Sequence, residues 1–92
     1  MPTKIWKYSG NHTPERSVGS YRVPVGTQFL SVDPTTGAIY CAVIDEPFKD
    51  FVMMDVMVVP TGVELCHSER PFRYGGLWID GIFRWHVWVR IP

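Results

Sequence analysis

The chain has 92 residues, of which 46% are hydrophobic and 14% aromatic, a composition that excludes a disordered protein and suffices for one small domain with a thin core. Its nine basic and nine acidic side chains cancel at pH 7, which excludes a protein that coats nucleic acid through bulk charge. No apolar run reaches the roughly 18 residues needed to cross a bilayer, and the N-terminus lacks the apolar stretch of a signal peptide, so we expect a single domain over residues 1–92 that stays in the cytoplasm.

Most segments alternate apolar and polar residues with a period of two, and none keeps a helical period over about 11 residues. Turn-forming residues separate these segments, and residues 33–37 favour a hairpin between two of them. The sequence therefore predicts an all-β or nearly all-β fold, a small antiparallel sandwich or barrel-like domain of about six or seven strands built from hairpins, with at most a short helical turn in 60–71. In chain order, the predicted strands are 4–8, 20–23, 28–32, 38–45, 51–59, 72–79 and 82–90.

The last two strands are predicted to form a hairpin that turns at Asp80-Gly81. An Asp-Gly pair between alternating runs favours a type I′ turn, because both central residues of that turn need φ > 0. The register that follows places Arg73 opposite Trp88. One face of this hairpin is then too polar for a core and too aromatic for a plain solvated surface, and we predict that it binds a ligand or partner. The predicted binding residues are Arg73, Arg84, His86, Trp88 and Arg90.

Each residue type on this face has two interpretations. In one interpretation, Arg73 and Trp88 form a cation–π contact that only stabilises the pairing of the two strands. Such a contact is worth about 0.5–1 kcal/mol at an exposed site. In the other, Trp and Arg act as binding hot spots, and such a surface stacks a base and holds its phosphate. His86, expected opposite Gly75, either contacts a ligand as a neutral imidazole or is a structural histidine bonded to backbone or to a neighbouring acid.

Strand 51–59 has apolar residues on both faces. An antiparallel strand normally turns one face to water, so its second face has to lie between two sheets or against another subunit. Methionine suits adaptable contacts, and an aspartate in such a patch needs a partner once it is buried. We expect a homodimer or larger assembly through this strand, with an intramolecular sandwich core as the alternative. The predicted interface residues are Phe51, Met53, Asp55 and Met57.

The sequence predicts no catalytic residue, no metal site and no cofactor. The three histidines have no metal-ligand spacing, and the adjacent pair Cys66-His67 differs from catalytic Cys/His pairs, whose members converge from separate elements. The carboxylates within 45–55 are expected to be solvated around a turn. Cys41 and Cys66 are expected to be free thiols, with Cys41 in the core.

Six short motifs follow one another along the chain: Ile5-Trp6-Lys7, Val23-Pro24-Val25-Gly26, Phe29-Leu30-Ser31-Val32, Val43-Ile44-Asp45, Pro60-Thr61-Gly62 and Trp85-His86-Val87-Trp88. Their order resembles a family of small uncharacterised proteins encoded mainly by tailed bacteriophages. The resemblance covers nearly the whole chain, although members usually carry Gly-Thr-Gly at the fifth motif and a shorter segment than residues 8–22. It implies a phage accessory protein acting in the host cytoplasm, supplies no catalytic residue, and draws attention to Thr61, Gly62 and His86.

These observations predict a non-enzymatic phage accessory protein that acts by binding, most simply a counter-defence inhibitor. It either blocks a host protein, which requires an exposed apolar patch around Met53 and Met57, or sequesters a small anionic, nucleotide-like signal in a pocket floored by the binding residues above. A structural virion or assembly component is an alternative and would form higher oligomers. A small hydrolase acting through His86 or Cys66-His67 is a third possibility, but the sequence offers it no nucleophile–base–orienter set.

Overall fold

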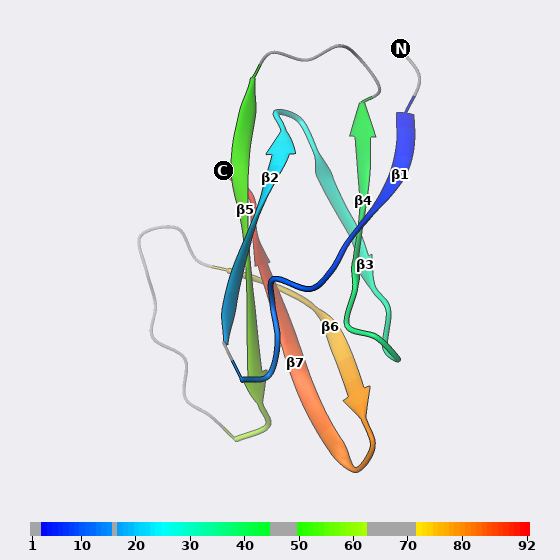
Figure 1. Cartoon of the computed structure of the whole chain (residues 1–92), viewed down its shortest axis with the longest axis vertical. Coiled ribbons are helices and arrows are strands. Elements are labelled where there is room, and N and C mark those ends of the chain that lie inside the picture. Colours follow the sequence, from blue (N-terminus) through cyan, green and yellow to red (C-terminus); the bar gives the residue numbers. More distant parts are fainter. Residues whose placement is uncertain (1–2, 16, 45–49, 63–71) are drawn as a thin grey trace.

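A computed structural model describes residues 3–15, 17–44, 50–62 and 72–92, which contain seven strands and no helix. The prediction of an all-β, antiparallel fold is confirmed, and within these residues no helix is long and apolar enough to cross a membrane. One sheet has three strands in the order β1-β4-β3, namely β1 (Thr3–Tyr8), β4 (Ile39–Ile44) and β3 (Gln28–Val32). The other has four in the order β2-β5-β7-β6, namely β2 (Val18–Pro24), β5 (Phe51–Pro60), β7 (Phe83–Arg90) and β6 (Arg73–Asp80) (Figure 1).

The strands lie within two residues of their predicted positions, and β3 and β4 form the predicted hairpin. β4 and β5 belong to different sheets, so the connection between them crosses from one layer to the other instead of closing a hairpin. Part of the turn predicted at 46–50, and most of the connection 60–71 with its possible helical turn, lie outside the described residues.

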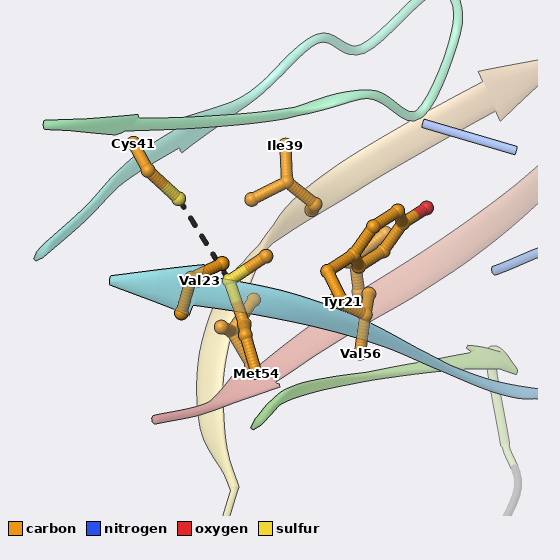
Figure 2. Close-up of a cluster of buried hydrophobic side chains, with 8 residues drawn as sticks. Tyr21, Val23, Ile39, Cys41, Met54 and Val56 are labelled. Carbon is orange, nitrogen blue, oxygen red and sulfur yellow. Dashed lines mark hydrogen bonds between the residues drawn. The ribbon is translucent and has the colours of Figure 1, made fainter. Parts of the chain in front are cut away.

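The core lies between the two sheets and consists mainly of branched aliphatic and sulfur-containing side chains (Figure 2). Met54 on β5 meets Cys41 on β4 across the layers, with the Cys41 Sγ 3.7 Å from the Met54 Sδ. Burying a side chain of this size contributes about 1.5–3 kcal/mol to stability. The fully buried residues include Val23, Ile39, Cys41, Met54, Val56 and Val87, each with 0% of its surface exposed.

A buried histidine ties the two sheets together at one side of this core. The Nε2–H of His12 donates to the Gly37 carbonyl at 2.5 Å, and its Nδ1 accepts a hydrogen bond from the Tyr21 hydroxyl at 2.6 Å. A carbonyl only accepts, so the ring carries its hydrogen on Nε2 and is neutral. Burial lowers the pKa of His12 below its ordinary value. Tyr21 belongs to β2 and Gly37 precedes β4, so this ring joins one sheet to the other.

The turn before β4 also packs directly on β6. Gly37 has φ +77°, and a Cβ at this position would collide with the ring of Trp78. The backbone amide of Ile79 donates to the Pro34 carbonyl at 2.7 Å. Only glycine combines the positive φ with this close approach, so Gly37 fixes how the three-stranded sheet meets the end of β6.

The β6–β7 hairpin turns one residue later than predicted. Asp80 pairs with Phe83, which leaves Gly81 and Ile82 as the two central residues. Gly81 has φ +60°, whereas Ser17 is the only non-glycine residue with a positive φ in the described part of the chain. Gly81 therefore takes the first central position of a type II′ turn, and the predicted type I′ turn at Asp80-Gly81 is wrong because it would also have forced Asp80 to positive φ.

A β-bulge in β6 changes the register a second time. The pairing shifts between Tyr74 and Gly76, so Tyr74 lies opposite Trp88 and Arg73 lies opposite Val89. The extra residue is Gly75, where a Cβ would come within 3.1 Å of the Phe29 ring. The predicted pairing of Arg73 with Trp88 is therefore wrong, because one unpaired residue moves every side chain beyond it to the other face.

We expect His12→Ala to lower the free energy of unfolding by about 1–3 kcal/mol, because it leaves the Gly37 carbonyl buried without its histidine partner and removes the acceptor of the Tyr21 O–H, whose oxygen still accepts from the Asn11 amide. The folded pKa of His12 lies below its unfolded value of about 6.5, so the unfolded chain binds more protons between the two values. The stability contributed by neutral His12 is present above about pH 6.5 and is lost as the pH falls towards the folded pKa.

Urea unfolding of the wild type, His12→Ala and His12→Gln at several pH values below 7.5 measures both effects. His12→Gln retains hydrogen-bonding groups, so we expect it to be more stable than His12→Ala. Neither variant titrates at this position, so we expect both to lose less stability in acid than the wild type. An acid dependence equal in all three proteins would contradict the assignment.

The Cys41 thiol should be inert in the folded protein. Burial raises its pKa to about 11, so almost none of it is thiolate at pH 8, and the thiolate is the reactive form. In a Cys66→Ser variant, which leaves Cys41 as the only thiol, a disulfide-exchange reagent at pH 8 should label the protein only as fast as it unfolds. Rapid labelling in the absence of denaturant would show that Cys41 is accessible.

Candidate functional site

Apart from Arg73, the residues predicted for binding and those predicted for an interface lie on one surface. On β5 and β7 the register pairs Asp55 with Arg90 and Met57 with Trp88, while the valines between them are buried against the other sheet. We call the outward side chains of the four-stranded sheet the outer face. Its members on β5 and β7 are Phe51, Met53, Asp55, Met57, Val59, Arg84, His86, Trp88 and Arg90, and β2 and β6 add Val18, Ser20, Arg22, Tyr74, Leu77 and Ile79.

Arg73 does not belong to the outer face. It is paired with Val89, whose side chain points to the core, and the bulge at Gly75 gives its predicted place beside Trp88 to Tyr74. The Tyr74 and Trp88 rings are 5.1 Å apart in a T-shaped contact. The pair Gly75-Gly76 was the sequence signal for a bulge, but alternation alone did not assign its position.

The three-stranded sheet packs on the opposite side of the four-stranded sheet, so it does not cover the outer face. This argues against the alternative stated above, in which the second face of β5 lies between two sheets. Several large apolar side chains on the outer face are exposed; Phe51 and Met53 are successive outward residues of β5, and Val18 on β2 lies opposite Met57. The exposed side chains are Val18 at 48%, Phe51 at 41%, Met53 at 49%, Tyr74 at 51% and Ile79 at 39%.

The aspartate in this apolar surface has two partners. Asp55 Oδ2 accepts hydrogen bonds from Arg90 Nη2 at 2.8 Å and from Arg90 Nε at 3.2 Å. Its other oxygen accepts one from the Ser20 hydroxyl at 2.7 Å. The Arg90 guanidinium also lies over the Phe72 ring, 4.4 Å from its centroid. A carboxylate and a guanidinium that are both partly buried are therefore neutralised locally, as such a surface requires.

The other arginines of the outer face also have partners within the chain. Arg84 donates from Nη1 to the carbonyls of Gly81 and Phe83 at 3.1 and 3.2 Å, and the Arg22 guanidinium lies 4.3 Å from the centroid of the Phe51 ring. Arg84 and Arg90 are six residues apart on one strand, which separates their Cα atoms by about 20 Å. The arginines therefore do not converge on one point where they could grip a single phosphate together.

His86 sits between two hydroxyl groups from neighbouring segments. Its Nε2 lies 2.7 Å from Thr61 Oγ1, directly after β5, and its Nδ1 lies 2.9 Å from the Tyr74 hydroxyl on β6. Its partners are thus neither backbone groups nor acids, the two partners expected for a structural histidine. The motif resemblance had singled out Thr61 and His86, and the fold brings these two side chains into contact. Tyr74 was missed because it depends on the bulge.

The more acidic hydroxyl of this set decides how its hydrogens are ordered. A phenol is more acidic than an alcohol, which favours the neutral tautomer of His86 in which the Tyr74 O–H donates to Nδ1 and the Nε2–H donates to Thr61. In a hydrolytic triad the imidazole has to accept the proton of the nucleophile, and in this tautomer Nε2 already carries a hydrogen.

Within residues 3–15, 17–44, 50–62 and 72–92, no group of three or more His, Cys, Asp or Glu side chains is placed to hold a metal ion. Cys66 and His67 lie outside these residues. Comparison of the chain with protein-family models, with curated proteins and with solved structures finds no match. The candidate site is therefore argued from its own geometry.

A double-mutant cycle tests the Asp55–Arg90 pair. Both side chains are about a quarter exposed, at 24% and 28%, so solvent screens their attraction and we expect a coupling of about 1 kcal/mol between Asp55→Asn and Arg90→Gln. The coupling, measured by urea unfolding, should shrink when the salt concentration rises to about 1 M. Additive effects of the two substitutions would show that the ion pair contributes nothing to stability.

Proposed function

We propose that this chain is a non-enzymatic phage accessory protein that blocks a host protein by docking its outer face against it, as a counter-defence inhibitor does. The phage origin rests on the sequence motifs described above. The observation that supports docking is the exposed apolar cluster of Phe51 and Met53, successive outward residues of β5, while the exposed Val18 of β2 lies further along the same face, opposite Met57. Exposed apolar side chains grouped on a sheet surface are typical of protein interaction sites.

The charges of the outer face favour a protein partner over a small anion held by arginines. Arg90 is paired with Asp55, Arg84 is bonded to turn carbonyls, and Arg22 lies over an aromatic ring. A ligand that recruited these guanidinium groups would first have to break those contacts. A protein partner would bury Met53 and Phe51 and leave these arginine contacts intact. Methionine and aromatic residues are enriched at such interfaces.

The same surface suits self-association, as expected for β5 from its sequence. A second copy of the chain would cover Met53 and Met57 with the same side chains. The two occupants differ in solution, because a dimer forms in the purified protein and a host complex forms only when the host protein is present. The mass of the purified chain therefore distinguishes them.

We expect Met53→Glu to abolish capture of a bacterial partner, because it places a charge in the apolar cluster next to Phe51. The matched control is Leu30→Glu on β3, which changes a side chain of similar exposure, 46%, on the other sheet. Both substitutions are at exposed positions and should change stability by less than about 1 kcal/mol. Affinity capture from lysate with the wild type and both variants, together with light scattering of each purified chain, measures the outcome.

A partner retained by the wild type and Leu30→Glu but lost from Met53→Glu would support the proposal. A partner retained equally by all three proteins would remove the outer face as the docking surface. A dimer in the wild type that Met53→Glu converts to a monomer would assign the face to a second copy.

A further inference from the structure

The set formed by Thr61, His86 and Tyr74 is distinct from the apolar cluster and has a property that depends on one proton. All three side chains are accessible to solvent around their hydrogen bonds. In the neutral form described above, the Tyr74 hydroxyl donates its only hydrogen to Nδ1 and has none left for a ligand. Only the Thr61 hydroxyl then has a hydrogen to offer to a ligand.

Protonation of His86 reverses one of these hydrogen bonds without moving any ring. Both nitrogens of an imidazolium are donors, so Nδ1 then donates to the Tyr74 oxygen and Nε2 continues to donate to Thr61. Hydroxyl hydrogens rotate to suit their surroundings. The Tyr74 and Thr61 hydroxyls are both released as donors, and they flank a positive ring.

Among the described residues, the acidic side chain on this face is engaged elsewhere and is not bonded to His86. On the outer face, β5 contributes Asp55, which is bonded to Arg90 of β7 and to Ser20 of β2. β7 also contributes Arg84, which is held on the turn carbonyls. The outward residues of β6 on this face, Tyr74, Leu77 and Ile79, include no carboxylate.

The main chain beside Thr61 is not closely packed against the described residues. The next residue, Gly62, has φ +90°, and a Cβ placed on it would have no other atom within 4 Å.

We propose that Thr61, His86 and Tyr74 form an oxyanion-binding site that is switched on when His86 takes up a proton. Its ligand is a tetrahedral or planar oxyanion such as a phosphate or carboxylate, bound by two O–H donors and the imidazolium charge. The oxyanion comes either from a small molecule or from an acidic or phosphorylated side chain of a docked protein. The site stands independently of the proposed docking of a host protein, because an inorganic ion suffices to test it.

Sulfate is the probe, because it stays doubly charged across the pH range in which histidines titrate. NMR titrations that follow the ring C–H signals of His86 in the full chain should show saturable binding at about pH 5.5. The imidazolium charge is lost on deprotonation, so we expect affinity at about pH 8 to be weaker than at about pH 5.5. His12, buried and fully hydrogen-bonded, is the internal control whose signals should not respond to sulfate.

Two near-isosteric variants test the donors. Thr61→Val and Tyr74→Phe each remove one hydroxyl and keep the shape of the side chain, and each should weaken sulfate binding about tenfold, while Thr61→Ser keeps the hydroxyl and should bind normally. The fold of every variant is checked by the core signals of the same spectra. Absence of saturation at low pH, equal affinity at both pH values, or unchanged affinity in both variants would leave an adventitious ion only and overturn the proposal.

Two further titrations distinguish the sources of the oxyanion. Adenosine monophosphate binding more tightly than sulfate would assign the site to a free nucleotide-like ligand. A short acidic peptide binding more tightly than either would assign it to a side chain of a docked protein. Met53→Glu separates this site from the docking surface, because we expect it to lose partner capture and to retain sulfate binding.

Discussion

The strand β5 imposes the main constraint on this molecule, because it is apolar on both faces and can turn only one of them to the three-stranded sheet. Its inward residues, Met54, Val56 and Val58, are fully buried and build the core. Hydrogen bonding to β2 on one side and to β7 on the other fixes it inside the four-stranded sheet. Phe51 and Met53 are consequently left exposed on the opposite side, and the candidate docking surface is the counterpart of a well-packed core.

Two glycines in the neighbouring strands decide what shares that surface. Gly81 sets the position of the turn, and Gly75 is the unpaired residue of the bulge. Together they place His86 and Trp88 beside Tyr74 and turn Arg73 to the other side. The bulge therefore places the Tyr74 phenol beside Trp88, where the sequence predicted the Arg73 guanidinium. The hydroxyl of Tyr74 forms a hydrogen bond with His86.

Local patterns predicted most of the fold and half of the site. The strand Gln28–Val32 and its hairpin follow from alternation and from the turn 33–37, both of which are short-range signals. The common face of Arg84, His86, Trp88 and Arg90 follows from the two-residue period of one strand. The partners of these residues do not, because Arg90 meets Asp55 across a pair of strands that are far apart in the sequence. The unpaired residue of the bulge reverses a face, whereas the one-residue shift of the turn changes the cross-strand partners and keeps the faces, and alternation carries no information about either.

The strand order also determines when β5 becomes protected during folding. Only β3 with β4 and β6 with β7 are neighbours both in sequence and in a sheet, whereas β5 pairs with β2 and β7 across long connections. Such non-local pairings form late, so an apolar strand with high β-propensity is exposed in the meantime and is prone to aggregate. Asp55 is the only charged residue between Phe51 and Pro60. The carboxylate that binds Arg90 in the folded protein is therefore also the charge that interrupts this apolar segment, the position that gatekeeper residues occupy in β-proteins.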